Sequence, residues 1–248
     1  MSDFKKITNE LPISGTALDV LKLLAAAFMV IDHMDDILFD RTMPVMLLIG
    51  RVVFPIFCFA TMAAILRGGL DSAKTYAVRL LVLAVFVEPI SQISRQVDVA
   101  NILFTLAIGA ALIPYVYQAS HRMRIMVFTV GILALWWPDQ WEYGILGAFI
   151  PSVMYLVMKE DRGERYIPWL ILMLALFNFG DISQHLIGMS EELLAFMVVV
   201  MCVTIFGPWL LIISARHIQG EKRIMPKYFL HIFYPAHLII LAVINEFV

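Results

Sequence analysis

The sequence has few charged residues. Asp, Glu, Lys and Arg make up only 15% of its 248 residues, 61% are hydrophobic, and the mean hydropathy is +0.86. A soluble domain averages about 25% charged and about 45–50% apolar residues. The composition therefore excludes an ordinary soluble domain and predicts an all-α, polytopic integral membrane protein.

Several sequence signatures are also missing. The two cysteines, Cys58 and Cys202, lie apart in apolar runs and lack the spacing of a metal site or a disulfide framework, so both are expected to be small core residues. There is no Walker loop and no Rossmann glycine pattern. The start of the chain carries Lys5 and Lys6 without the pattern of a signal peptide, so the first helix is expected to act as the insertion signal.

No internal repeat, low-complexity segment or long linker divides the chain. Residues 1–248 are therefore expected to form a single transmembrane domain, with any chemistry in or at the membrane. A spanning helix needs about 20 mostly apolar residues. Nine runs fit this template, near 18–39, 45–66, 76–94, 101–118, 123–138, 142–158, 166–184, 193–213 and 228–247.

Basic residues are distributed unevenly among the predicted loops. With the N-terminus in the cytoplasm, 15 of the 18 Lys and Arg residues fall on the cytoplasmic side, and Arg41, Arg51 and Arg95 fall toward the outside. This is the positive-inside pattern. It predicts a multi-pass protein surrounded by membrane lipids, with its N-terminus inside and its C-terminus outside.

The stretch Met29–Asp36, MVIDHMDD, places ionisable groups inside the first predicted helix. Such groups cost at least about 2.5–3.5 kcal/mol each at a bilayer centre, so a chain keeps them there when they face a protected interior. Asp32 and His33 are therefore candidate catalytic residues. No second set of ligands has a recognisable spacing, so no metal is predicted.

Arg51 is expected at a similar depth to His33, in the outer half of the membrane. His33 lies nine residues before Thr42 and Arg51 nine residues after it, on two helices joined by a short turn. This count gives depth and not azimuth. Because Arg51 stays charged, it needs an anion, for which Asp32 or Asp36 is the internal candidate.

Other polar residues reach the same level. Glu88 lies near the end of the third predicted helix, Asn101 begins the fourth, and Glu142 and Tyr143 begin the sixth. These four are candidate substrate-binding residues, and their position near the interface is equally compatible with a structural role. His237 lies about midway along the last helix and is a second candidate base.

Four basic residues of the predicted cytoplasmic segments have two interpretations. Topology alone explains the presence of basic residues at these positions. The four are also candidates for holding a polyphosphate ligand from the cytosol: Arg67, Arg79, Arg122 and Arg124. His231 lies near the same predicted surface and is expected to be interfacial.

Several short motifs, in this order along the chain, resemble the TraX family. They are Asp32-His33, Gly50-Arg51 with Phe54-Pro55, Asn101 with Phe104-Thr105, Tyr143-Gly144, Lys227-Tyr228, and Phe233-Tyr234-Pro235-x-His237-Leu238. The resemblance covers essentially the whole chain. It departs at Glu142, where many relatives have Asp before Tyr-Gly.

The resemblance implies an N-acetyltransferase of the bacterial inner membrane that acetylates the N-terminus of an F-type conjugative pilin, with acetyl-CoA as donor and without nucleic acid as a partner. It also implies kinship with integral-membrane acyltransferases that use an early-helix His and a nearby Arg. His33 would then act as general base or be transiently acetylated, and Asp32 or Asp36 would set its tautomer. Arg51 would stabilise the oxyanion or hold a CoA phosphate.

The residues alone leave two other classes open. Intramembrane Asp, His and Arg also build proton relays, as in a proton-coupled transporter. The protein could equally be a non-catalytic subunit of a membrane assembly complex.

Overall fold

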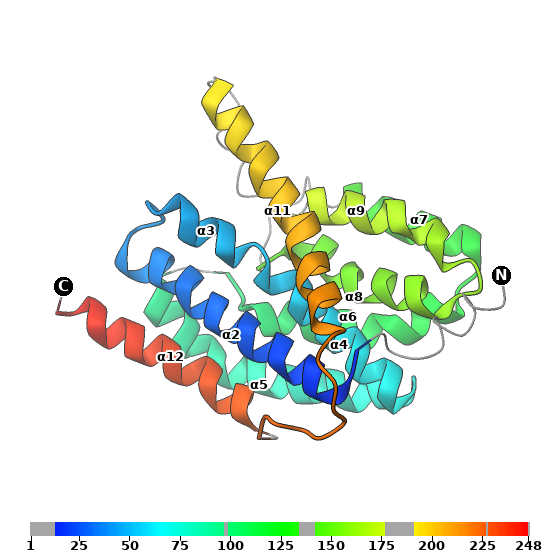
Figure 1. Cartoon of the computed structure of the whole chain (residues 1–248), viewed down its shortest axis with the longest axis horizontal. Coiled ribbons are helices and arrows are strands. Elements are labelled where there is room, and N and C mark those ends of the chain that lie inside the picture. The colour runs from blue at the N-terminus through cyan, green and yellow to red at the C-terminus, as the bar shows by residue number, and fades with distance from the viewer. Residues whose placement is uncertain (1–12, 97–98, 134–141, 177–190, 227, 248) are drawn as a thin grey trace.

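The structure, a computed structural model, describes residues 13–96, 99–133, 142–176, 191–226 and 228–247, and these are mostly helical (Figure 1). The elements are α2 (Gly15–Leu38), α3 (Pro44–Gly50), α4 (Val53–Gly68), α5 (Ser72–Arg95), α6 (Ile102–Gln118), α7 (His121–Leu133), α8 (Gly144–Lys159), the 3₁₀ helix η2 (Gly163–Tyr166), α9 (Ile167–Leu176), α11 (Glu191–Ala215) and α12 (Phe229–Asn245). The predicted all-α class is confirmed.

Three helical stretches are long and apolar enough to cross a membrane, Pro44–Gly68, Ser72–Arg95 and Ala195–Ala215. Three shorter helices, α6, α8 and α12, are also apolar. These helices indicate a membrane protein. The predicted runs 123–138 and 166–184 extend past Leu133 and Leu176, into residues outside those described.

The second predicted helix, near 45–66, matches the stretch Pro44–Gly68, but this stretch is interrupted in the structure. α3 ends at Gly50 and α4 begins at Val53, with a two-residue turn that contains Arg51. Pro55 has no N–H to donate to the Arg51 carbonyl, and glycine weakens a helix at its own position. The break places Arg51 at a junction of two helices.

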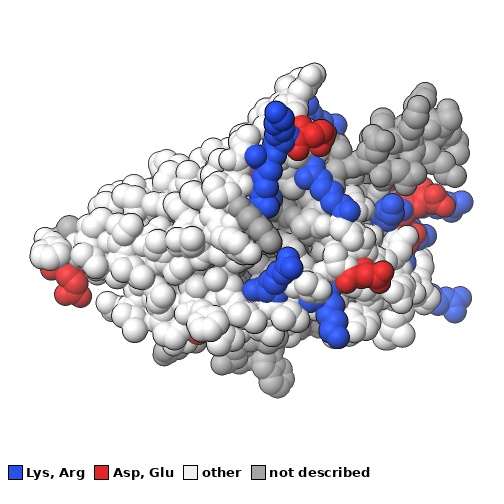
Figure 2. Space-filling view, turned by 90° about the horizontal axis from the view of Figure 1, so that it is seen from below, with Lys and Arg blue, Asp and Glu red and all other residues white. Residues whose placement is uncertain are grey.

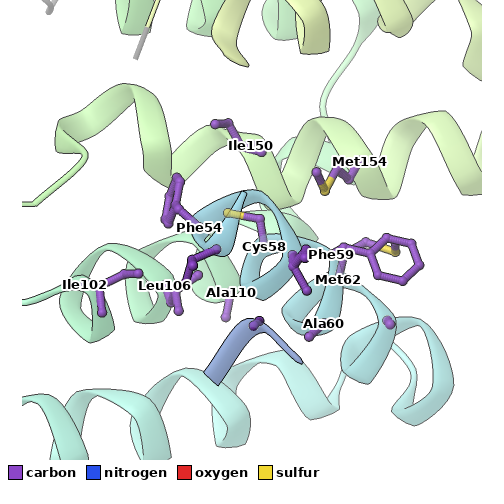
Figure 3. Packing of buried hydrophobic residues seen from close by; sticks show 14 of the residues in the cluster. Phe54, Cys58, Phe59, Ala60, Met62, Ile102, Leu106, Ala110, Ile150 and Met154 are labelled. Atoms are coloured by element: carbon purple, nitrogen blue, oxygen red, sulfur yellow. The ribbon is translucent and has the colours of Figure 1, made fainter. Parts of the chain in front are cut away.

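α4 lies at the centre of the packing, in contact with α2, α6 and α8. Its side chains Phe54, Cys58 and Met62 are fully buried. Figure 3 shows these side chains beside Leu106 of α6 and Ile150 of α8. Cys58 is therefore a core residue, as expected.

α11 packs less completely, and its first half projects from the other helices (Figure 1). Val198, Val199 and Phe206 are exposed apolar residues of this helix. Cys202 is exposed as well. The expectation that Cys202 lies in the core is wrong, because α11 contacts the bundle over only part of its circumference.

The loop between α11 and α12 folds back onto the start of α2. The Ser14 hydroxyl donates to the Ile218 carbonyl at 2.9 Å. The Asp19 carboxylate accepts from the backbone N–H groups of Ile224 and Met225, each at 3.2 Å. The loop thereby joins the beginnings of α2 and α12.

Lys and Arg residues gather where α2 and α12 begin, which we call the basic end. Figure 2 shows Lys and Arg in one half of the face that it views, and the other half is almost free of them. The opposite end contains the turns between α2 and α3 and between α5 and α6. The basic end includes Arg67, Lys74, Arg79, Lys222 and Arg223.

Candidate functional site

Two histidines from distant parts of the chain meet inside the bundle. His33 of α2 and His237 of α12 are both buried, and His33 Nδ1 lies 2.7 Å from His237 Nε2. The two rings are nearly parallel, with an interplanar angle of 6° and centroids 5.0 Å apart. This contact joins the two helices and places two titratable rings in a protected interior.

The hydrogen-bond pattern assigns the protons of this histidine pair. His237 Nδ1 lies 3.0 Å from the Phe233 carbonyl oxygen, which only accepts, so Nδ1 carries a proton. In a neutral ring, His237 Nε2 then accepts from His33 Nδ1–H. His33 Nε2 is then the nitrogen without a proton, and its lone pair makes it the basic atom of the two rings.

From the sequence, we predicted that a carboxylate, Asp32 or Asp36, fixes the tautomer of His33. The structure places His237 at His33 Nδ1 instead. Asp36 pairs with arginines, and Asp32 faces the turn between α3 and α4. That expectation is therefore wrong, because α12 reaches the His33 ring on the side where a carboxylate was expected.

Asp32 lies directly against the turn between α3 and α4. A Cβ added to Gly50 would lie 1.9 Å from Asp32 Oδ1, so only glycine allows this approach. Arg51 is close enough to interact electrostatically with Asp32. Arg51 therefore lies at the level of Asp32 along the helices, and Asp32 is the internal anion beside it, whereas the depth of Arg51 and His33 in a membrane stays a prediction.

Arg95, in the last turn of α5, links α2 to the turn before α8. Its Nε lies 2.7 Å from Asp36 Oδ2, and its Nη1 lies 3.1 Å from Glu142 Oε1. Asp36 Oδ1 also accepts from Arg41 Nε at 2.7 Å. The Arg95 side chain is 6% exposed and that of Arg41 is 44% exposed. Arg95 thus forms the buried centre of a charge-assisted network.

Three of the predicted substrate-binding residues hold the beginning of α6. Asn101 Oδ1 accepts from Leu103 N–H at 3.0 Å, and Asn101 Nδ2 donates to Glu88 Oε2 at 2.6 Å. Glu142 Oε2 accepts from Ile102 N–H at 3.0 Å. These bonds satisfy N–H groups that a helix start leaves without intrahelical partners. They give Glu88, Asn101 and Glu142 a structural role, and substrate binding by them stays a prediction.

Tyr143, the fourth of these residues, adopts a left-handed backbone with φ of +64° just before α8. Its ring stacks on Phe54 with centroids 4.0 Å apart and an interplanar angle of 6°. Tyr143 is within electrostatic range of Asp32 and Arg51. The turn before α8 thereby brings this side chain beside the α3–α4 turn.

The structure separates the four predicted cofactor-binding arginines into two groups. Arg67 donates to the Ile13 carbonyl at 3.1 Å and is within electrostatic range of Lys22 on α2. Arg79 of α5 is within electrostatic range of His231 on α12. Arg67 and Arg79 therefore lie around the beginnings of α2 and α12.

Arg124 belongs to a different cluster, at the start of α7. It is buried, and it donates to the Val116 carbonyl at 2.9 Å and to the Tyr166 hydroxyl at 2.7 Å. Its Nη1 also lies 2.8 Å from Glu160 Oε1. These contacts join α6, α7 and α8, while the neighbouring Arg122 is exposed.

Sequence reasoning did not select two residues that the structure places at the site. Arg95 lies on the predicted outer side, where basic residues are rare, and this unusual position was a signal in the sequence that it has a specific role. Tyr234 precedes His237 by three positions and so shares its helix face. The Tyr234 ring lies 6.3 Å from that of His33 and 5.6 Å from that of His237, between centroids.

Together these features define a helical membrane protein with a buried histidine pair beside a carboxylate–guanidinium network. Among the described residues, no group of three or more His, Cys, Asp or Glu side chains is arranged to hold a metal ion. A family model described as TraX protein matches residues 17–245. The chain belongs to the TraX family, and the resemblance stated from its motifs is confirmed.

Two curated proteins show the extent of the similarity. Protein TraX of Escherichia coli is 27% identical over 232 residues, which cover 91% of this chain and 86% of that protein. An uncharacterized protein of Rickettsia prowazekii (strain Madrid E) is 27% identical over 143 residues, 56% of this chain and 53% of that protein. No solved structure matches the chain.

Proposed function

We propose that this protein is a multi-pass acetyltransferase of the bacterial inner membrane that transfers an acetyl group from acetyl-CoA to the N-terminal amine of an F-type conjugative pilin. The basic end would face the cytoplasm, where the acetyl donor is found, in accord with the positive-inside rule. The amine of a processed pilin would approach from the opposite end. Membership of the TraX family supports this choice of reaction.

The observation that carries the proposal is the hydrogen bond between His33 and His237. A general base needs a lone pair on a nitrogen held in one orientation, and His237 with the Phe233 carbonyl provides that orientation for His33. An α-amine has a pKa of about 7.7–8.0, so its deprotonation near neutral pH is a modest task for an imidazole. His33 Nε2 is the atom to which we assign it.

The proposed transfer is a single displacement at the thioester carbonyl. The pilin nitrogen attacks the carbonyl carbon as His33 Nε2 takes a proton from the amine. The carbon–sulfur bond then breaks, CoA leaves as a thiolate, and the proton returns from His33 to the sulfur. The products are the N-acetylated pilin and CoA. A path through acetylated His33 gives the same products in two steps.

Charge forms on the carbonyl oxygen during this attack and needs a nearby donor. Arg51 is the proposed donor, because the α3–α4 turn brings it beside Asp32, one residue before His33. Asp32 would hold Arg51 in place as its counterion. Glu88, Asn101, Glu142 and Tyr143 would shape the opening through which the pilin N-terminus enters.

The test uses purified full-length protein with acetyl-CoA and a peptide that carries the pilin N-terminus. Mass spectrometry should detect an N-terminally acetylated peptide that is absent when either substrate is omitted. Proton flux across proteoliposomes without these substrates would instead identify a transporter. The absence of both activities, with stable co-purification of other membrane subunits, would identify an assembly component. Either result would overturn the proposal.

A further inference from the structure

A narrow cavity lies between α2, α4, α5, α6 and α12 and leads from the basic end toward the histidine pair. Its volume is about 110 Å³, and apolar side chains such as Leu80, Leu83 and Leu106 form much of its wall. Lys22 and His231 line it toward the basic end, and Tyr234 lines it on the side of the histidine pair. The cavity therefore extends from Lys22 and His231, beside the basic end, to Tyr234, whose ring neighbours the histidine pair.

Basic side chains from five elements surround the entrance of the cavity. Lys22 is within electrostatic range of Arg67 and Arg223, and His231 is within range of Arg79 and Arg223. Figure 2 shows Lys and Arg gathered at this end of the molecule. The entrance thus concentrates positive charge contributed by α2, α4, α5 and the α11–α12 loop, with His231 of α12 beside it.

One acidic residue, Asp19, lies beside this cluster, and its oxygens are already engaged. Oδ2 accepts from the backbone N–H groups of Ile224 and Met225, and Oδ1 lies 3.4 Å from Lys22 Nζ. Asp19 thus orients the loop that carries Arg223. The cluster keeps a net positive charge, which suits a ligand with several phosphate charges.

Two polar side chains line the cavity among its apolar walls. His231 Nδ1 is buried without a hydrogen-bond partner among the described residues, and the buried Tyr234 hydroxyl, which interacts with Ser91, can make a further hydrogen bond. Leaving buried polar groups without partners costs free energy. A ligand that carries polar groups along an otherwise apolar chain would satisfy both atoms.

We infer that this cavity and its basic entrance form the donor site for a CoA thioester, an inference that rests on the function proposed above. The phosphates of the nucleotide would bind Arg67, Arg79 and Arg223 at the entrance. The thin pantetheine arm would enter the cavity, where its amides meet His231 and Tyr234. The cavity is smaller than the roughly 300–1,000 Å³ of a typical small-molecule pocket, so the nucleotide stays outside.

This site differs from the sequence-based assignment in its membership. It keeps Arg67 and Arg79 and adds Lys22, Arg223 and His231. Arg124 is not part of it, because its guanidinium is bound to Val116, Tyr166 and Glu160 in the cluster at the start of α7. The matched control for charge removal is therefore Arg165, an exposed residue beside that cluster.

The experiment measures the binding of unacetylated CoA to the purified full-length protein by isothermal titration calorimetry. Arg67→Gln, Arg79→Gln and Arg223→Gln should each raise the Kd for CoA by about fivefold or more, since each removes one charged contact worth more than a neutral hydrogen bond. Arg165→Gln should leave the Kd within about twofold of the wild type.

A second variant tests the cavity separately from its entrance. Ala60 lines the cavity on α4, and Ala60→Phe would fill it. This variant should lose CoA binding and still bind adenosine 3′,5′-bisphosphate, which carries the nucleotide without the arm. Retained binding of the nucleotide also shows that the variant is folded. Undiminished CoA binding by Ala60→Phe would overturn the inference.

The outcomes separate this inference from the proposed function. If the wild type binds CoA and the three entrance variants bind it equally well, the donor site lies elsewhere and the proposed reaction is unaffected. If CoA binding depends on the entrance and the cavity but no acetyl group reaches the peptide, the donor site holds and the proposed reaction fails. Wild-type protein that does not bind CoA would overturn both.

Discussion

His33 and His237 are separated by 204 positions in the chain, yet their ring nitrogens lie 2.7 Å apart. Because His237 Nδ1 is committed to the Phe233 carbonyl, the bond has a direction, with His33 as donor. The two rings therefore have different roles. His33 presents the basic nitrogen and is the proposed catalytic residue, whereas His237 is a positioning residue.

Replacing His33 should abolish most of the acetyl transfer. His33→Ala removes the general base, a contribution that is typically about 10²–10⁴-fold in rate. The fraction of acetylated pilin in cells, measured by mass spectrometry at equal protein levels, should fall accordingly. His217→Ala, at an exposed loop position, serves as the control and should retain full activity. Complete acetylation by His33→Ala would refute the assigned role.

Replacing His237 should affect both stability and the pH profile. His237→Phe leaves the His33 Nδ1–H buried without its acceptor, at a cost of about 1–3 kcal/mol in the free energy of unfolding. The dependence of kcat on pH should also change, because the His33 tautomer is no longer fixed. His237→Gln keeps a carbonyl acceptor and should recover part of the activity. An unaltered pH profile in His237→Phe would contradict the positioning role.

Arg95 and Arg41 provide a matched pair, since both contact Asp36 but differ in burial. Arg95→Ala leaves the Glu142 and Asp36 carboxylates without their buried partner, and we expect a loss of about 3–5 kcal/mol in the free energy of unfolding. Arg41→Ala removes a more exposed pair and should cost no more than about 1 kcal/mol. Denaturant unfolding in detergent measures both, and equal losses would argue against Arg95 as the centre of the network.

Gly50 should tolerate no side chain while Asp32 is present. Gly50→Ala places a Cβ 1.9 Å from Asp32 Oδ1, so one of the two must move, and overpacking of this kind costs about 1–3 kcal/mol. In the double variant Gly50→Ala/Asp32→Gly, none of the Asp32 side-chain atoms that crowd the added Cβ remains. A double-mutant cycle should therefore give a favourable coupling energy, and strictly additive losses would show that the contact is unimportant.

The proposed orientation can be tested with single cysteines in a chain that has Cys58→Ser and Cys202→Ser. Lys222→Cys in the α11–α12 loop should react with a membrane-impermeant maleimide only in inside-out vesicles, since this loop carries the basic residues of the proposed cytoplasmic side. Glu246→Cys, just after α12, should react only in spheroplasts. The reverse labelling pattern would place acetyl-CoA at the wrong end of the molecule for the proposed donor site.

The sequence predicted the helices of the site well, because long apolar runs determine which segments are helical. The predicted runs 18–39, 101–118 and 228–247 agree with α2, α6 and α12 to within a few residues. Counting residues on either side of the turn at Thr42 also placed Arg51 at the level of Asp32, since two helices joined by a short turn run antiparallel.

Pairings between distant helices could not be predicted in the same way. Depth follows from counting along each helix, but the direction in which a side chain points depends on how the helices pack. His237 was placed midway along its helix, deeper than the level of His33, and the 2.7 Å contact between the two rings shows that this predicted depth was wrong. Arg95 was missed because its partners Asp36 and Glu142 come from two other elements.

The loop that Asp19 holds against α2 has a mechanical consequence for the histidine pair. α2 and α12 carry one imidazole each, and this loop sets how far one helix is displaced along the other. A helix rises about 1.5 Å per residue, so a slip of two residues, about 3 Å, would stretch the 2.7 Å bond to about 4 Å, beyond hydrogen-bonding distance. The position of the loop thus determines how the two rings are aligned. Releasing the loop from Asp19 would separate the rings although no residue in contact with either imidazole is changed.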